Sequence, residues 1–460
     1  MNTNVIAVFD IGKTNKKILL FDQVFNLVYQ YEEKFSTTVD DDGFECDDIQ
    51  LIKNWMVNTL SALVEEGKFD IQAINFSTYG ASLAFLDKKG KLLAPIYNYL
   101  KEVNPEIQES LFQEYGGMDE FCRQTASPAL GLLLNSGVQA LWLKKEKKEI
   151  WDKVENTLHF PQYLSFVLTG KITSEPTSIG CHTFMWDFDK MQYHPWVKKE
   201  GVKLPKPVTN NMVYSALIKG KTIKTGVGIH DSSASLVPYL QNSKEEFILV
   251  STGTWCISMN PFNDQPLTSN QLKNDCLCFL TPEKRQVKSS RLFMGHFHET
   301  LVFKLNDFFL TEADFYKEIP CNSDLVELVN QKFKDELYFF PEGIGNFDQA
   351  VDKLDFSVFK DFTEAYTRMV VELTQLCIFS IELIIPQKDI TKTIFISGGF
   401  SRNKIFVSLL SHYFTDKKVC TSEIDNASAL GAALVVAANV DGFITDNIEL
   451  KSNNNRTILK

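Results

Sequence analysis

The chain is 460 residues long, with 44% hydrophobic and 23% charged residues and a net charge of 47 − 58 = −11. This length suits two domains, and the acidic balance argues against a nucleic-acid-binding surface. The sequence has no uninterrupted apolar run of about 18 residues, the length needed to cross a bilayer. The first residues, MNTNVIAVFDIG, lack the pattern of a signal peptide. We therefore expect a cytoplasmic protein without membrane or nucleic-acid partners.

The nine cysteines are scattered, with nothing denser than one C-x-C. No C-x-x-C pair indicates a zinc site or a redox motif. We expect the cysteines to be reduced thiols of the core. The motif HFHET at 296–300 lacks the one-face spacing of H-E-x-x-H, so it predicts no metal site.

Residues 5–21 are predicted to form a β-hairpin. The apolar run VIAVF is followed by the polar, glycine-containing turn DIGKTNKK and a second apolar run, ILLF. The pattern returns later as FILV, STGTW and CISM, with Gly253 in the place of Gly12 and Ser251 in the place of Asp10. Two copies of one hairpin indicate a duplicated domain, whose two turns we expect to face each other across a cleft.

This repeat predicts an N-terminal domain at 1–235, a C-terminal domain at 236–445 and a polar, frayed tail at 446–460. Within the first domain, IQLIKNWMVNTLSALVEEG is predicted to form a helix that ends at Gly67, with Asp47 as its N-cap.

Three further segments of the first domain have recognisable patterns. IQAINFSTYG is predicted to be a strand, and AFLDKKGKLL a hairpin around Lys89 and Gly90. Residues 105–170 are mainly helical in pattern. We interpret them as an insertion near the substrate.

The second domain closes with clearer elements. FTEAYTRMVVELTQLCIFSIELII is predicted to be a long helix, and KTIFISGGFSRNKIFVSLLSHYF a strand, a Gly-Gly turn and a helix. ASALGAALVVAANV is more typical of a tightly packed helix than of a ligand site.

Phosphoryl transfer needs donors around phosphates, a carboxylate for Mg²⁺ and a group that orients the attacking hydroxyl. In DIGKTNKK, Gly12 lets the backbone approach phosphate, Lys13, Thr14 and Asn15 add donors, and Asp10 can hold hydrated Mg²⁺. An ordinary hairpin turn explains the same residues. The pairing of two such hairpins favours the functional interpretation.

Two further segments supply candidates of similar ambiguity. In VGIHDSSAS, Asp231 at the start of a small-residue helix is either the base for the hydroxyl or simply an N-cap. His230 either bonds a sugar oxygen or satisfies a nearby carbonyl. Gly398 and Gly399 of ISGGFSRN either admit adenine or ribose against the backbone or allow close strand-to-helix packing.

In order and over nearly its whole length, the chain resembles the FGGY carbohydrate kinases, and among them the L-rhamnulose and L-fuculose kinases. The matching segments are DIGKTNKK, DGFECDD, FSTYGASLAFLDKKGKLL, LWLKKEKKEIW, YLSFVLTGKITSEPTSIGCHTFMWD, GIHDSSAS, STGTW and ISGGFSRN. The resemblance implies an α/β fold of duplicated ribonuclease H-like domains, as in actin and hexokinase. It also implies ATP, Mg²⁺, a small-molecule sugar substrate, and a monomer or homodimer.

Residue roles follow from the matched motifs. The resemblance implies Asp231 as catalytic base, Gly80, Tyr79 and His230 as sugar contacts, and Asp10 as the Mg²⁺ carboxylate. The nucleotide set that it implies is Asp10, Gly12, Lys13, Thr14, Asn15, Gly253, Thr254, Gly398, Gly399 and Asn403.

The chain departs from the family pattern at four places, one of which is the region 285–300, RQVKSSRLFMGHFHET. Lys13 stands where many members have a small residue, Lys17 where arginine is usual, and Ala81-Ser82 where the rhamnulose-type kinases have Val-Asp. Open alternatives are therefore a kinase for another ketose or polyol, such as xylulose or ribulose, and a catalytically impaired sensor. An actin-like polymer, a chaperone ATPase and a sugar-responsive repressor are less favoured, because no peptide-binding or DNA-binding segment is recognisable.

Overall fold

The computed structural model describes residues 2–334, 336–422, 424, 426–445 and 452–454. The chain divides into two compact units that exchange segments. Unit 1 comprises Met1–Ser243, Asp264–Val287 and Asp425–Glu449, and unit 2 comprises Lys244–Asn263, Lys288–Ile424 and Leu450–Lys460. The continuous ranges expected from the sequence remain a prediction, and most of the predicted tail at 446–460 lies outside the described residues.

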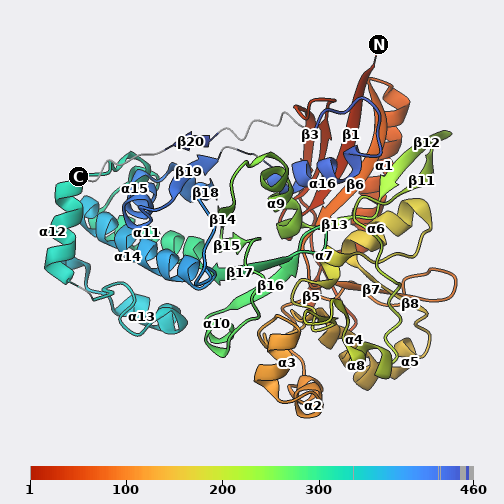
Figure 1. The fold of residues 1–460 in the computed structure, drawn as a ribbon, viewed down its shortest axis with the longest axis horizontal. Coiled ribbons are helices and arrows are strands. Elements are labelled where there is room, and N and C mark those ends of the chain that lie inside the picture. Colours follow the sequence, from red (N-terminus) through yellow and green to blue (C-terminus); the bar gives the residue numbers. More distant parts are fainter. Residues whose placement is uncertain (1, 335, 423, 425, 446–451, 455–460) are drawn as a thin grey trace. The chain divides into compact units, whose positions relative to one another are not determined.

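The central sheet of unit 1 has the strand order β11-β12-β6-β1-β2-β3, and β13 also pairs with β6 (Figure 1). The predicted N-terminal hairpin is confirmed, because β1 and β2 pair antiparallel up to Ile11 and Lys16, while β1 runs parallel to β6. The strands are β1 (Thr3–Ile11), β2 (Lys16–Phe21), β3 (Leu27–Glu33), β6 (Phe69–Thr78), β11 (Val213–Ile218), β12 (Lys221–Gly226) and β13 (Ile229–His230).

The sheet of unit 2 repeats this plan. A hairpin of β14 and β15 continues into antiparallel β17, and β18 and then β19 lie parallel on the other side of β14. The strands are β14 (Phe247–Thr252), β15 (Cys256–Asn260), β17 (Gln286–Leu292), β18 (Thr393–Gly398), β19 (Lys418–Ser422) and β20 (Ser452–Asn454). The duplicated fold predicted from the two hairpins is therefore confirmed.

Helix α1 (Ile49–Glu66) follows its apolar pattern, since Ile52, Met56, Leu60 and Leu63 are its buried residues. It ends at Gly67 as predicted, with φ 67° at that residue. The N-cap prediction was wrong by one residue. The carboxylate of Asp48, not Asp47, accepts hydrogen bonds from the backbone N–H groups of Gln50 and Leu51.

The predicted hairpin around Lys89 and Gly90 is present as a short one, in which the backbone N–H of Leu93 donates to the carbonyl of Phe85 over 2.9 Å. Strand β7 (Leu83–Leu86) pairs mainly with β8 (Asn156–His159), and the returning segment contributes one bridge, between Leu86 and Leu92. The remaining strands of unit 1 are β4 (Thr38–Val39), β5 (Glu45–Cys46), β9 (Trp186–Asp187), β10 (Gln192–Tyr193) and β16 (Cys276–Leu280).

The segment from 105 to 170 is mainly helical, as predicted. The helices of unit 1 besides α1 are α2 (Glu106–Glu114), α3 (Met118–Gln124), α4 (Ser136–Glu146), α5 (Lys148–Trp151), α6 (Phe160–Thr169), α7 (Pro176–Ile179), α8 (Pro195–Lys199), α9 (Asp231–Asn242), α10 (Ser269–Lys273) and α16 (Ala427–Ala437).

Helices α9 and α16 lie side by side, and α16 packs on β1 and β6 (Figure 1). A Cβ added at Gly431 would come within 1.8 Å of the carbonyl oxygen of Ala234, so only glycine permits this approach. The tightly packed helix predicted from the small residues of α16 is confirmed. Its packing also brings the start of α16 to the end of β1.

Unit 2 adds the predicted long helix, α14 (Phe362–Glu382), and the predicted strand-turn-helix of β18, η5 and α15. Its other helices are α11 (Met294–Phe309), α12 (Ser323–Phe333), α13 (Phe347–Ala350) and α15 (Lys404–Tyr413). The 3₁₀ turns are η1 (Phe315–Glu318), η2 (Ile344–Asn346), η3 (Val351–Lys353), η4 (Phe356–Val358) and η5 (Gly399–Arg402).

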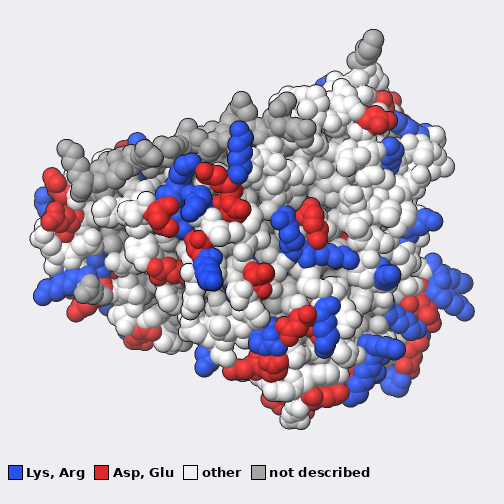
Figure 2. Space-filling model, in the orientation of Figure 1, with Lys and Arg blue, Asp and Glu red and all other residues white. Residues whose placement is uncertain are grey.

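None of the nine cysteines, all of which lie in the described part of the chain, forms a disulfide, and all but the half-buried Cys321 are buried. Within the described part of the chain, no helix combines the length and apolar character that a membrane crossing requires. Figure 2 shows basic and acidic side chains interspersed over the visible face.

Candidate functional site

Asp10 lies near the end of β1, where its carboxylate meets α16. The Ser428 hydroxyl donates to Asp10 Oδ2 over 3.0 Å, although the two residues are 418 positions apart. Burial raises the pKa of Asp10 to about 6, and the nearby Asp231 adds to that rise, while Ser77, Ser428 and Lys17 oppose it. A bound cation would relieve this desolvation, so the site fits the predicted role in holding Mg²⁺.

Asp231 is the first residue of α9, and the N-cap position belongs to His230. The backbone N–H of Ser232 donates to Asp231 Oδ1 over 2.6 Å, and His230 Nε2 lies 3.3 Å from the same oxygen. Burial raises the pKa of Asp231 to about 6, against the opposing effect of Ser232. The carboxylate can therefore accept a proton near neutral pH, and the simple N-cap alternative does not describe it.

Gly80 follows β6 and makes room for two imidazoles. A Cβ at this position would lie 2.9 Å from His230 Nε2 and 3.6 Å from His182 Cε1. Burial lowers the pKa of His230 to about 4, so its ring is neutral at physiological pH. The close approach explains why glycine stands at this position.

Tyr79 contacts the buried carboxylate of Asp47, for which the sequence pattern predicts a helix cap. Its hydroxyl donates to Asp47 Oδ2 over 2.8 Å, and the ammonium groups of Lys13 and Lys16 each bond Asp47 at 2.8 Å. Lys13 also lies over the rings of Tyr79 and Tyr99, at 5.5 and 5.7 Å from the centroids. The Lys13 side chain is therefore engaged beside Tyr79.

Tyr99 was missed by the sequence analysis. Burial raises the pKa of its hydroxyl, and the charges of Asp231 and Asp47 raise it further. Tyr99 is therefore within electrostatic reach of both carboxylates, and it connects the Asp47 contacts with the residues around Asp231.

The turn between β1 and β2 is closed by the backbone N–H of Gly12, which donates to the carbonyl of Asn15 over 2.9 Å. Thr14 is exposed. The Oδ1 atom of Asn15 is buried and has no hydrogen-bond partner among the described residues. An unpartnered polar atom beside an exposed turn fits a site that is completed by a polar ligand.

In unit 2 the two predicted glycine turns lie at the ends of neighbouring parallel strands. Thr252 of β14 is in register with Gly398 of β18, and Gly253 and Thr254 are exposed in the turn that follows. Gly398 has φ 84°, and a Cβ there would lie 2.0 Å from the Thr252 carbonyl oxygen. At Gly399 the nearest such contact is 3.9 Å.

These distances indicate different roles for the two glycines. Close packing alone accounts for Gly398, whereas it does not account for Gly399. Asn403 has a structural part, because its Oδ1 accepts the backbone N–H of Phe406 as the N-cap of α15. Its Nδ2 donates to the Tyr366 hydroxyl over 2.9 Å. Both polar ends of the predicted nucleotide contact are thus engaged within unit 2.

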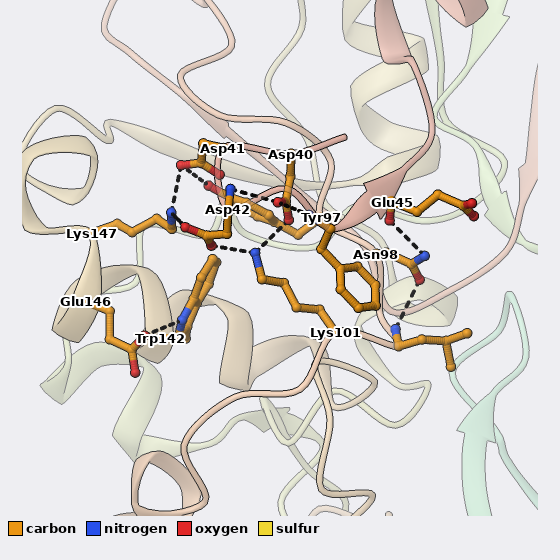
Figure 3. A network of polar contacts seen from close by, with 12 residues as sticks. Asp40, Asp41, Asp42, Glu45, Tyr97, Asn98, Lys101, Trp142, Glu146 and Lys147 are labelled. Carbon is orange, nitrogen blue, oxygen red and sulfur yellow. Dashed lines mark hydrogen bonds and ion pairs between the residues drawn. The ribbon is translucent and has the colours of Figure 1, made fainter. Parts of the chain in front are cut away.

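A second polar network holds the short β4–β5 hairpin that precedes Asp47 (Figure 3). Lys101 bonds Asp40 and Asp42, and Lys147 bonds Asp41 and Asp42. Because two lysine ammonium groups already pair with all three carboxylates, we assign no cation site to them. A neighbouring cavity of about 520 Å³ is lined by Asp42, Lys101, Glu102, Val103, Asn104, Trp142, Glu146 and Lys147, none of which is a predicted site residue.

The predicted residues therefore fall into two groups, each described within its own unit. The group of unit 1 is Asp10, Gly12, Lys13, Thr14, Asn15, Tyr79, Gly80, His230 and Asp231; the group of unit 2 is Gly253, Thr254, Gly398, Gly399 and Asn403. The facing of the two turns stays a prediction. Asp47, Tyr99, His182 and Ser428 were missed as site residues, although Asp47 in DGFECDD and His182 in the segment ending GCHTFMWD lie in segments that carry the family resemblance.

Family models match most of the chain. Residues 5–229 match the N-terminal domain of the FGGY family of carbohydrate kinases, and residues 244–442 match the C-terminal domain of FGGY carbohydrate kinases. Curated relatives include a rhamnulokinase of Mannheimia succiniciproducens, 23% identical over 41% of this chain and 40% of the relative. A rhamnulokinase of Yersinia pestis is 27% identical over 50% of this chain and 47% of the relative. The chain thus spans about half the length of the curated relatives it matches.

Solved structures extend the likeness to the whole fold. A carbohydrate kinase from Novosphingobium aromaticivorans has a TM-score of 0.78 and 23% identity, with 96% of this chain and 92% of that chain covered. A xylulose kinase from Lactobacillus acidophilus has a TM-score of 0.73 and 17% identity, with 94% and 89% covered. With both domain models matched in order and the duplicated sheets present, the chain belongs to the FGGY family of carbohydrate kinases.

Proposed function

We propose that this protein is an ATP-dependent sugar kinase in which Asp231 receives the proton of the sugar hydroxyl. The observation that carries the proposal is a pair of neighbouring carboxylates, Asp10 and Asp231, whose pKa values are both raised to about 6 by burial. Two such groups at the ends of β1 and β13 suit one metal-binding and one proton-accepting role.

In the proposed reaction the acceptor O–H gives its proton to the Asp231 carboxylate. The acceptor oxygen forms a bond to the γ-phosphorus, and the bond from that phosphorus to the bridging oxygen breaks. ADP leaves with the electron pair. The hydrogen bonds from Ser232 hold the Asp231 carboxylate in place, and a loose transition state needs the hydroxyl oriented first and deprotonated late.

Acceptor binding is assigned to Tyr79, Gly80 and His230. The neutral His230 ring can exchange hydrogen bonds with a sugar hydroxyl, and Gly80 leaves space beside it. L-Rhamnulose and L-fuculose are the first candidate sugars, since the curated relatives named above are rhamnulokinases. D-Xylulose, L-ribulose and polyols are the alternatives.

Phosphate binding is assigned to the turns at Gly12 and Gly253, with Thr14, Asn15 and Thr254 as further donors. When bound, Mg²⁺ would neutralise phosphate charge, with Asp10 holding it through water. Gly399 and Asn403 are assigned to the nucleotide, although the contacts of Asn403 with Phe406 and Tyr366 favour an indirect role. Lys13 remains a candidate phosphate donor once it leaves Asp47.

The test is ADP release from Mg-ATP across a panel of L-rhamnulose, L-fuculose, L-ribulose, D-xylulose and matched polyols. Asp231→Asn should lower kcat by a factor of about 10²–10⁴, because the proton acceptor is lost, and ATP affinity should stay within about twofold. Asp152→Asn is the matched control, because Asp152 is exposed and pairs only with Lys148 among the described residues.

Near-normal turnover by Asp231→Asn would remove the proposed base. A protein that binds ATP and a sugar by calorimetry, without sugar-dependent ADP release, would instead be the impaired sensor.

A further inference from the structure

The contacts around Gly80 include a second arrangement with its own chemistry. Cys181, His182 and His230 each offer one ligand atom, and these three atoms all lie within 4.8 Å of one another. Cys181 and His182 follow the short helix α7, and His230 ends β13. Two separate segments of unit 1 thus bring a thiol and two imidazoles together.

His182 is oriented as a metal-binding histidine usually is. Its Nδ1 lies 2.8 Å from the backbone carbonyl oxygen of Leu134, which can only accept a hydrogen bond. The proton therefore sits on Nδ1 and the lone pair on Nε2. A carbonyl partner on the second ring nitrogen fixes the tautomer and the ring orientation at many metal sites. The backbone of His182 is also held at φ 39°, which is uncommon for a non-glycine residue.

His230 supplies a second nitrogen ligand. The Nδ1 atom of this buried ring has no hydrogen-bond partner among the described residues, and Nε2 has a 3.3 Å contact with Asp231. An unsatisfied nitrogen in a buried imidazole is costly unless a ligand completes it. The absence of a Cβ at Gly80 leaves the space in which both imidazoles approach.

The ligand types select the ion. One thiolate and two imidazole nitrogens are typical of Zn²⁺, which accepts three protein ligands and leaves a fourth position open. Mg²⁺ prefers oxygen ligands, so the Asp10 carboxylate and this trio would bind different metals. The predicted Mg²⁺ site therefore does not account for Cys181 and His182.

We propose that Cys181, His182 and His230 bind Zn²⁺, and that the bound ion blocks the acceptor side of the site. The blocking effect rests on the proposed function, because Gly80 and His230 are the assigned sugar contacts. A zinc ion held between the two imidazoles beside Gly80 would occupy space that the proposed function assigns to the sugar. Zinc is therefore expected to compete with the sugar and not with Mg-ATP.

Binding is tested on the full chain with Zn²⁺ against a chromogenic chelator in excess Mg²⁺, and with Co²⁺ as a spectroscopic substitute. One ion per chain should bind with a dissociation constant on the order of micromolar or below. Co²⁺ should give the visible bands of a tetrahedral site and a thiolate charge-transfer band. Cys181→Ser should abolish the thiolate band and weaken Zn²⁺ binding by at least about a hundredfold.

Cys321→Ser is the matched control, because Cys321 is the half-buried thiol of unit 2. It should bind Zn²⁺ as the unmodified chain does. His182→Asn provides an independent loss of one ligand, with circular dichroism to show that the variant is folded. Binding that survives both Cys181→Ser and His182→Asn would overturn the assignment, as would a Co²⁺ spectrum without a thiolate band.

The kinetic arm measures Zn²⁺ inhibition at varied sugar and varied ATP. Inhibition that raises the KM for sugar, and that is lost in Cys181→Ser with its zinc-free activity retained, is the expected result. Inhibition that is competitive with Mg-ATP would contradict the blocking mechanism. If no sugar is phosphorylated, the proposed kinase function fails, whereas the chelator and Co²⁺ measurements still decide the metal site.

Discussion

The two units use the same sheet for different chemistry. In unit 1 the candidate groups are side chains, since Asp10, His230 and Asp231 have shifted pKa values and bond one another or nearby hydroxyls. In unit 2 the exposed candidates are backbone turns at Gly253 and Gly399, and the neighbouring side chains are engaged in packing. Duplication thus kept the backbone scaffold, while the ionisable candidate groups of the site lie in unit 1.

This comparison predicts which kind of substitution each unit tolerates. Unit 1 should respond to changes of charge that preserve shape, and to pH. The glycine turns of unit 2 should respond to added methyl groups.

The largest effect in unit 2 is expected for Gly398→Ala. A Cβ would be placed 2.0 Å from the Thr252 carbonyl oxygen on a backbone with φ 84°. The steric clash and the positive φ should together lower the free energy of unfolding by about 1–3 kcal/mol or more, and they should weaken ATP binding. Gly399→Ala is the matched control, with 3.9 Å to the same oxygen. Urea unfolding and nucleotide titration measure both, and equal stability of the two variants would contradict this account.

The pH profile tests the carboxylates of unit 1 next. Asp231 must be deprotonated to accept a proton, and its pKa is raised to about 6. We expect kcat/KM to fall about tenfold per pH unit below pH 6 through Asp231 alone, and more steeply because Asp10, the proposed Mg²⁺ carboxylate, is protonated over the same range. Circular dichroism at each pH controls for unfolding. A kcat/KM that stays constant down to pH 5 would show that the carboxylate is not the limiting base.

Much of this contrast could be predicted from the sequence. The hairpins, the helix ending at Gly67, the Gly-Gly turn and the start of a helix at Asp231 all follow from local patterns. The contact between Ser428 and Asp10 could not, because it joins residues 418 positions apart through the packing of α16. Asp47 shows the same limit. Local capping rules assigned it to a helix, and only the fold reveals Lys13, Lys16 and Tyr79 around it.

A smaller effect concerns the stability of unit 1. Because burial raises the pKa of Asp231 from 3.8 to about 6, the folded chain binds this proton more tightly than the unfolded chain. Its contribution to stability is full below about pH 4 and is lost as pH rises through 6. The melting temperature of Asp231→Asn minus that of the unmodified chain should therefore rise as pH increases from 4 to 7. An unchanged difference in melting temperature across this range would show that the carboxylate is well solvated.

The smallest expected effects come from two threonines of unit 2 that differ only in their surroundings. The Thr252 hydroxyl donates to the Ser397 carbonyl and accepts the backbone N–H of Phe400, whereas Thr254 is exposed in the turn. Thr252→Ala should cost about 1 kcal/mol or slightly more in unfolding free energy, because a buried N–H loses its partner. Thr254→Ala should leave stability unchanged and raise the KM for ATP by a few fold, if its hydroxyl meets the phosphates. If instead Thr252→Ala raised the KM for ATP and Thr254→Ala lowered stability, the nucleotide would lie on the β18 side of the turn.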